Sequence, residues 1–207
     1  MSNMTFAVTD AVNYLQKLDW EVEQYRQMRD QGATYEKLSY CAINAMDTAW
    51  HAGVWAYAGI AKEQRQRLRE LLDFSSGPDE AEHFVGALSR VLRDLRLCRQ
   101  VAVYYKHYLP TRNAAREVVV TMSSVASCHT LYTTATGDGE VFTEVSVPRT
   151  VRIPKVIDGS DRHRVDELVI RVANFWREFL NEPVESVAKI KGLASGAKPQ
   201  VLSNRAT

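Results

Sequence analysis

The sequence lacks any apolar run that approaches the roughly 18 residues of a membrane-spanning helix, and it does not open with a secretory signal pattern. Cysteine is scarce: there are 3, none in a CxxC pair and none with the spacing of metal ligands. An odd number of isolated cysteines is typical of reduced thiols. These absences predict a soluble, cytoplasmic protein with no membrane partner.

The common motifs of catalysis and cofactor binding are also absent. No G-x-G-x-x-G or G-x-x-x-x-G-K-[ST] loop is present to cradle a nucleotide, and neither H-E-x-x-H nor G-x-S-x-G occurs. The 5 histidines are scattered singly, so no metal site and no cofactor are expected. Cys128 and His129 are neighbours on a predicted strand, where adjacent side chains point to opposite faces, so they cannot form a nucleophile–base pair.

Charge is balanced, with 26 Lys and Arg against 25 Asp and Glu and a net charge of +1. That balance argues against a protein that binds nucleic acid or an anionic membrane through bulk positive charge. A local anion site stays compatible with it.

The first half of the chain carries helical patterns. Apolar residues recur at three- and four-residue steps over 11–30, 35–61 and 78–108, and a charged helix is predicted over 62–72. The last and longest helix begins at Pro78 and stops before Pro110. Small residues such as Ala45, Ala49 and Gly53 line the core face of the second helix, which predicts close approach of another helix.

The second half changes to the period of two that strands show. Four runs rich in Val, Thr, Ile and Tyr, at 117–126, 128–136, 140–147 and 150–157, predict a small antiparallel sheet of three or four strands. A helix over 164–181 closes the core. The predicted fold is α+β: one domain over 1–182, with a helical region over 1–110 and a β-rich region over 111–160, followed by a mobile tail over 183–207.

The predicted long helix carries the chain's main candidates for a binding site. Arginine occupies every third position in its second half: Arg90, Arg93, Arg96 and Arg99. Arg99 and Lys106 lie about 20° apart at the edge of the apolar stripe. Long cations there need a carboxylate, a carbonyl or a bound anion, so Arg96 and Lys106 are candidate phosphate-binding residues. The alternative is that the cations reach solvent or pair with structural carboxylates.

The second helix has a face without the Lys and Glu of a solvated surface. It presents Asn44, Asp47, Thr48, His51 and Trp55. Asp47 and His51, at i and i+4, can hydrogen-bond each other. This face is either a second buried surface, or a surface across a cleft from Arg99, where Asp47 and His51 support a site. Its composition also predicts self-association.

The segment from Arg99 to His107, RQVAVYYKH, on the last long helix of a helical bundle, resembles the HEPN family of helical domains. The family motif is an Arg, commonly followed by a polar residue, with a His four to six residues further on. Here Gln100 follows Arg99, and seven residues separate Arg99 from His107. The resemblance covers roughly residues 4–108 and implies either a metal-independent, usually dimeric ribonuclease or a bundle of that type without activity.

If the resemblance extends to activity, it implies catalytic roles for two residues. Arg99, with Lys106, would stabilise the charge on a phosphate. His107 would act as general acid or base. Three hypotheses remain: a non-catalytic binding or assembly subunit on a HEPN-like bundle, a HEPN-type ribonuclease of a toxin or phage-defence system, and a small-molecule enzyme. The expected partners are further copies of the chain, another protein subunit or RNA.

Overall fold

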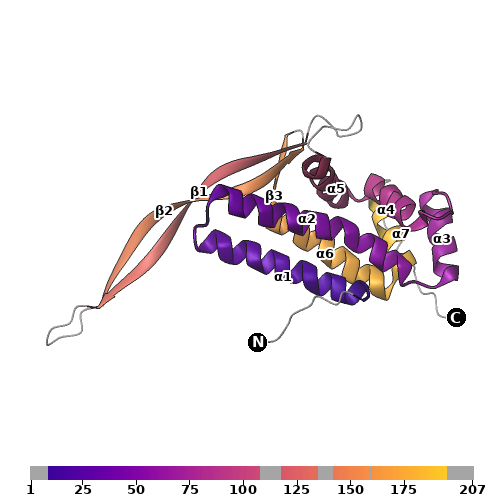
Figure 1. Ribbon diagram of the computed structural model, residues 1–207, viewed down its shortest axis with the longest axis horizontal. Coiled ribbons are helices and arrows are strands. Elements are labelled where there is room, and N and C mark those ends of the chain that lie inside the picture. Colours follow the sequence, from indigo (N-terminus) through magenta and orange to yellow (C-terminus); the bar gives the residue numbers. More distant parts are fainter. Residues whose placement is uncertain (1–8, 108–117, 135–141, 159, 195–207) are drawn as a thin grey trace, which may run out of the picture.

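The computed structural model describes residues 9–107, 118–134, 142–158 and 160–194, with side chains over 9–103, 155–158 and 160–193. The fold is α+β, as predicted: helices surround one core and an antiparallel sheet lies at one end (Figure 1). The helices are α1 (Ala11–Asp30), α2 (Tyr35–Ala58), α3 (Lys62–Leu72), α4 (Glu80–Val91), α5 (Arg93–His107), α6 (Val165–Asn181) and α7 (Pro183–Ala194). The strands are β1 (Val118–Thr134), β2 (Phe142–Asp158) and β3 (Asp161–Arg164).

The centre of the core is the contact between α2 and α6. Trp176 of α6 is fully buried, and its indole N–H donates to the carbonyl of Ala49 at 2.9 Å. The ring lies so close to α2 that a Cβ added at Gly53 would stand 2.7 Å from both Trp176 and Val85. The small residues on α2 therefore allow the close approach of another helix, as predicted, because they leave room for a large aromatic side chain.

The predicted long helix over 78–108 is wrong in one respect, because it is two helices. Leu92, between α4 and α5, has φ −101° and ψ 96°, which is extended backbone. Its N–H still donates to Leu88 at 2.9 Å, and its carbonyl accepts from Arg96 at 3.1 Å. The bend therefore preserves the hydrogen bonds of Leu92 itself while it redirects the chain. No Gly or Pro marks it, so local sequence signals did not indicate a break.

The predicted mobile tail is also wrong over its first part. Residues 183–194 form α7, which packs against α3, α4 and α6. Val184 and Val187 are buried, which stabilises the helix through tertiary contact. Residues 195–207 lie outside the described portion of the chain.

The sheet has the order β1-β2-β3, with antiparallel pairing throughout. The four predicted runs form two continuous strands of 17 residues each, and the short β3 lies outside them. The breaks expected near Ser127 and Pro148 do not occur. Pro148 and Pro154 lie six residues apart, so their nitrogens face the same edge of β2. A strand with a neighbour on only one edge tolerates proline there, since no ladder bond is lost.

The paired strands β1 and β2 form a ribbon that leaves the bundle beside the connection between α1 and α2 (Figure 1). Its register runs from Val118↔Asp158 at the base to Thr134↔Phe142 near the tip. At about 3.3 Å per residue, each strand is roughly 55 Å long. The predicted turn at 137–139 lies outside the described residues.

Ion pairs fasten the base of the ribbon to the bundle. Arg93 at the start of α5 bonds Asp158 at 2.8 Å and Asp161 at 2.6 Å. The hydrogen bond from Arg93 lowers the pKa of the Asp161 carboxyl. A further ion pair, from Arg171 to Asp94 at 2.6 Å, joins α6 to α5 within the bundle. Among the described residues, no helix is both long and apolar enough to cross a membrane.

Candidate functional site

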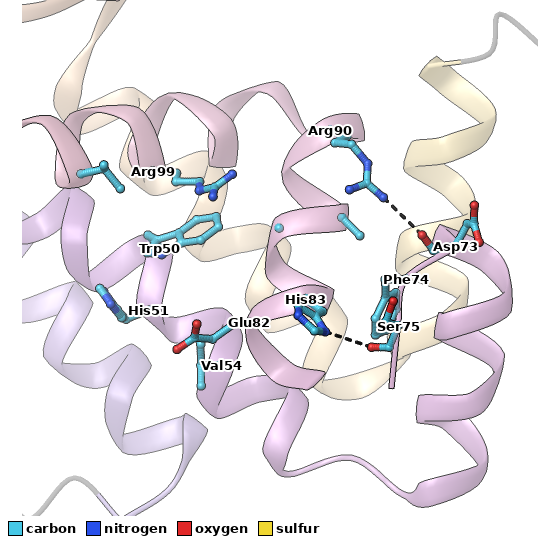
Figure 2. A pocket seen from close by; sticks show the side chains of 13 residues that line it. Trp50, His51, Val54, Asp73, Phe74, Ser75, Glu82, His83, Arg90 and Arg99 are labelled. Carbon is cyan, nitrogen blue, oxygen red and sulfur yellow. Dashed lines mark hydrogen bonds between the residues drawn. The ribbon is translucent and has the colours of Figure 1, made fainter. Parts of the chain in front are cut away.

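A cleft of about 680 Å³ opens between α2, α4 and α5, with the end of α3 at one side (Figure 2). Its walls combine aromatic, aliphatic, cationic and acidic side chains. The lining residues include Trp50, His51, Val54, Asp73, Phe74, Ser75, Glu82, His83, Arg90, Arg99 and Val103. The volume lies in the range of small-molecule sites, which span roughly 300–1,000 Å³.

Arg99 extends over Trp50 at one end of this cleft. The guanidinium carbon lies 5.1 Å from the centre of the indole ring, a cation–π contact. Arg99 is exposed, and none of the described carboxylates lies within ion-pair distance of it. The sequence predicted a partner for this cation, and the partner is an aromatic face, not an acid.

The other end of the cleft is formed by the α3–α4 connection. Arg90 donates to the carbonyls of Leu72 and Asp73, each at 3.4 Å. Asp73, which ends α3, has a φ of 53°. His83 contacts the carbonyl of Ser75 through Nδ1 at 3.2 Å. Arg90 and His83 are thus held by backbone oxygens, while the carboxylates of Asp73 and Glu82 belong to residues that line the same cleft.

Asp47 and His51 interact as their spacing predicted. Nδ1 of His51 lies 2.9 Å from the carbonyl of Asp47 and 3.4 Å from its carboxylate. His51 also lines the cleft with Arg99, so the structure brings these two predicted residues together. A hydrogen bond from Nδ1–H to the Asp47 carbonyl would leave Nε2 as the acceptor nitrogen of the neutral ring.

Two other residues of that face of α2, Thr48 and Trp55, pack against α1, as the buried alternative has it, while Asn44 is exposed. Trp55 is half-buried and stacks on Tyr14 at 5.6 Å. Thr48 is buried and accepts from Lys17 at 2.5 Å. Burial, with smaller contributions from the charges of Asp47 and Glu21, raises the pKa of Tyr14 to about 12. The absence of Lys and Glu at Thr48 and Trp55 therefore has an explanation within one chain.

Arg96 does not line the cleft. It contacts Asp158 of β2 at 3.4 Å, so the structure gives it the paired role that was the alternative to phosphate binding. Lys106 and His107 lie in the last turn of α5, and their side chains are outside the described residues. Because α5 is continuous from Arg93 to His107, Arg99 and His107 lie about 12 Å apart along its axis.

Sequence reasoning missed several lining residues. A single histidine such as His83 is usually structural, and an acid in the first turn of a helix, such as Glu82, is common, so neither residue indicated a site. The contact between Trp50 and Arg99 needs the packing of α2 on α5, and that packing leaves no local signal. In the sequence, only Arg99 at the edge of the apolar stripe and the unusual face of the second helix indicated that these two helices form a site.

The second candidate site is the ribbon beyond its base, over 123–134 and 142–153. The register pairs odd-numbered residues with odd-numbered residues, and successive residues alternate between faces. All Val, Leu and Ile residues of this segment occupy odd positions: Val125, Leu131, Val145, Val147, Val151 and Ile153. One face of the projecting ribbon is therefore aliphatic. At the base the parity is the opposite, since even-numbered Val156 is fully buried.

Two further findings bear on function. Among the described residues, no group of three or more His, Cys, Asp or Glu side chains is placed to hold a metal ion. The chain matches no family model, no curated protein and no solved structure.

Proposed function

We propose that this chain is a non-catalytic assembly subunit, in which the helical bundle is a scaffold and the β1–β2 ribbon is an arm that binds a second copy of the chain. The observation that supports this most directly is the ribbon itself. It leaves the bundle along paired strands of 17 residues and has its aliphatic residues on one face.

A ribbon of this kind favours association for physical reasons. A two-stranded hairpin is marginally stable in water unless a further strand, helix or chain covers it. Aliphatic surface left in water raises the free energy in proportion to its area. Paired edge strands also present N–H and C=O groups to other chains. Burying the odd-numbered face against another protein surface would stabilise the hairpin and remove its aliphatic residues from water.

A second copy fits this face in size and charge. The face beyond the base measures about 40 Å by 10 Å, so two copies would cover roughly 800 Å² between them, and specific interfaces bury at least about 1,000 Å². The bundles would supply the remainder. The face carries one residue with a full charge, Arg149, so two copies can meet without strong repulsion. A twofold pairing of identical faces is also the commonest arrangement in homo-oligomers.

The test is the oligomeric state of variants changed on either face. We expect the wild-type chain to be a dimer in light scattering, and the double variant Val145→Lys with Val147→Lys to be monomeric. The matched control is Ser146→Lys with Thr150→Lys, which places the same charges at even-numbered positions and should remain dimeric. A monomeric wild type at high concentration, or equal behaviour of the two variants, would contradict the proposal.

A second candidate function is a metal-independent ribonuclease of the HEPN type. The observation in its favour is that Arg99 and His51 line one cleft. Arg99 would stabilise charge on the scissile phosphate, and His51 or His107 would transfer the proton. The test is cleavage of RNA in the presence of a chelator by wild type, Arg99→Ala, His51→Ala and His107→Ala. Activity that survives all three substitutions would end this candidate.

A further inference from the structure

We infer that the cleft between α2, α4 and α5 binds a small organic phosphate that carries hydroxyl or amino groups, of the size of a nucleoside monophosphate. The inference concerns a different surface from the ribbon, so it does not depend on assembly. It rests on three features of the cleft: how Arg99 is held, which charged residues share the lining, and which apolar residues complete it.

Arg99 is positioned for an anion before any ligand binds. Its guanidinium carbon lies 5.1 Å from the centre of the Trp50 ring, and the N–H donors of a guanidinium project from the edge of its plane. Such a fork matches the two oxygens of a phosphate or carboxylate. The neighbouring arginines of α5 are already engaged, since Arg93 and Arg96 both bond Asp158. Arg99 is therefore the arginine of α5 without an acidic partner among the described residues.

The acids in the cleft select the rest of the ligand. Glu82 and Asp73 line the same cleft, with Asp73 at the end away from Arg99 (Figure 2). Arg90 is held by the backbone carbonyls of Leu72 and Asp73. A ligand with negative charge throughout would meet the two carboxylates. A ligand with one anionic group for Arg99 and hydroxyl or amino groups elsewhere would suit a lining that contains both a free arginine fork and acidic residues.

The cleft also has apolar walls, which suit an apolar or aromatic body. In Figure 2 Val54 lies near Trp50 and Phe74 lies near Asp73, and Ala87 also lines the cleft. Small-molecule sites commonly combine such apolar walls with a few polar groups that fix orientation. The acids also disfavour a longer strand of RNA, in which every nucleotide adds a negative charge.

The experiment is a titration followed by the indole N–H signals in nitrogen–proton NMR spectra. The chain has 4 tryptophans, and Trp50→Phe identifies the signal of Trp50. The probes are AMP, adenosine and inorganic phosphate. We expect AMP to shift the Trp50 signal at concentrations at least tenfold below those that adenosine or phosphate require. The same spectra recorded with an RNA oligonucleotide show whether a longer strand binds in place of the mononucleotide.

Two substitutions on α5 decide whether Arg99 is responsible. Arg99→Gln should weaken AMP binding at least tenfold and leave the melting temperature nearly unchanged, because its side chain is exposed. Arg96→Gln is the matched control, an exposed arginine one turn earlier that does not line the cleft, and it should leave AMP binding unchanged. Equal binding of AMP and adenosine, no shift of the Trp50 signal, or equal losses in the two variants would overturn the inference. None of these readouts requires RNA cleavage or a dimer.

Discussion

The helical bundle and the β-ribbon differ in where their apolar residues lie. In the bundle, residues at helical spacing are buried against one another, and Trp176 and Phe179 are fully enclosed. In the projecting ribbon, aliphatic residues at strand spacing share one face, and the helices contact only the base. The difference teaches that one chain can complete its core and still place aliphatic residues on one face of strands that leave that core.

This comparison separates two properties of the molecule. Contacts among α1, α2, α4, α5 and α6 set the free energy of unfolding, and the ribbon adds few tertiary contacts to them. Assembly, in the function proposed above, depends on the ribbon. Substitutions in the bundle should therefore change stability, and substitutions in the ribbon should change association.

Removal of the central aromatic side chain should have the largest effect on the bundle. Trp176→Ala would leave a cavity beside α2 and remove the hydrogen bond to Ala49. We expect a loss of about 3–5 kcal/mol in the free energy of unfolding, measured by urea denaturation. Trp20→Ala is the control, because that side chain is 51% exposed and should cost about 0.5 kcal/mol or less. Similar losses in both variants would mean that Trp176 is not the centre of the core.

Two glycines on neighbouring helices should respond in opposite directions. Gly53→Ala forces a methyl group to within 2.7 Å of Trp176 and Val85, so it should destabilise the chain by about 1–3 kcal/mol. A Cβ at Gly86 meets nothing within 4 Å, and Ala is the better helix former. Gly86→Ala should therefore stabilise the chain by about 0.5–1 kcal/mol. Urea denaturation of both variants checks the signs, and losses of equal size would contradict this packing.

Much of the bundle could be predicted because its signals are local. Apolar spacing identified the buried residues of α1, such as Leu18 and Tyr25, and those of α6. The extended residue Leu92 carries no local signal, because an apolar residue there suits a helix equally well. The helix α7 was missed for a related reason: its glycine and lysines read as a tail, and burial of Val187 stabilises it instead.

The candidate site was predicted only in a few of its residues, because its geometry depends on contacts distant in sequence. The helix edge identified Arg99, and the unusual face of α2 identified His51. The pairing of Arg96 with Asp158 joins residues 62 positions apart, which periodicity cannot show. Trp50 and His83 reach the cleft from two different helices, so their contribution to it required the fold.

The acid dependence of stability should be a smaller effect in the bundle. Glu80 accepts hydrogen bonds from Arg69 at 2.5 Å and from the Tyr57 hydroxyl at 2.9 Å, and the bond from Arg69 lowers its pKa below 4.5. The pKa of Glu80 is therefore lower in the folded chain than in the unfolded chain. Its interactions with Arg69 and Tyr57 stabilise the fold fully above about pH 4.5, and this stabilisation is lost as the pH falls through the folded pKa.

Glu80→Gln tests that dependence. The substitution should cost about 0.5–1 kcal/mol at pH 7, since both partners are partly exposed, and much less at pH 3. Urea denaturation of both proteins at each pH gives the difference, and the other carboxylates cancel in the comparison. A cost that is the same at pH 7 and pH 3 would show that the ionised pair does not contribute.

Shortening the ribbon should have the smallest effect on the stability of the bundle. Ser124 and Arg152 are register partners, so an Asn-Gly turn can join them in place of residues 125–151. The remaining base keeps the pairs from Val118↔Asp158 to Ser124↔Arg152. Because residues 125–134 and 142–151 lie away from the helices in Figure 1, we expect the free energy of unfolding to change by less than about 1 kcal/mol.

The contrasting substitution lies at the base of the same ribbon. Val156→Ala removes two methyl groups from a fully buried side chain, so it should cost about 1–3 kcal/mol although it changes one residue instead of 27. The shortened chain should also be monomeric in light scattering, while Val156→Ala should still associate at temperatures where it is folded. A large loss of stability on shortening would mean that the ribbon folds back on the bundle, because only contact with the helices could transmit its removal to the core.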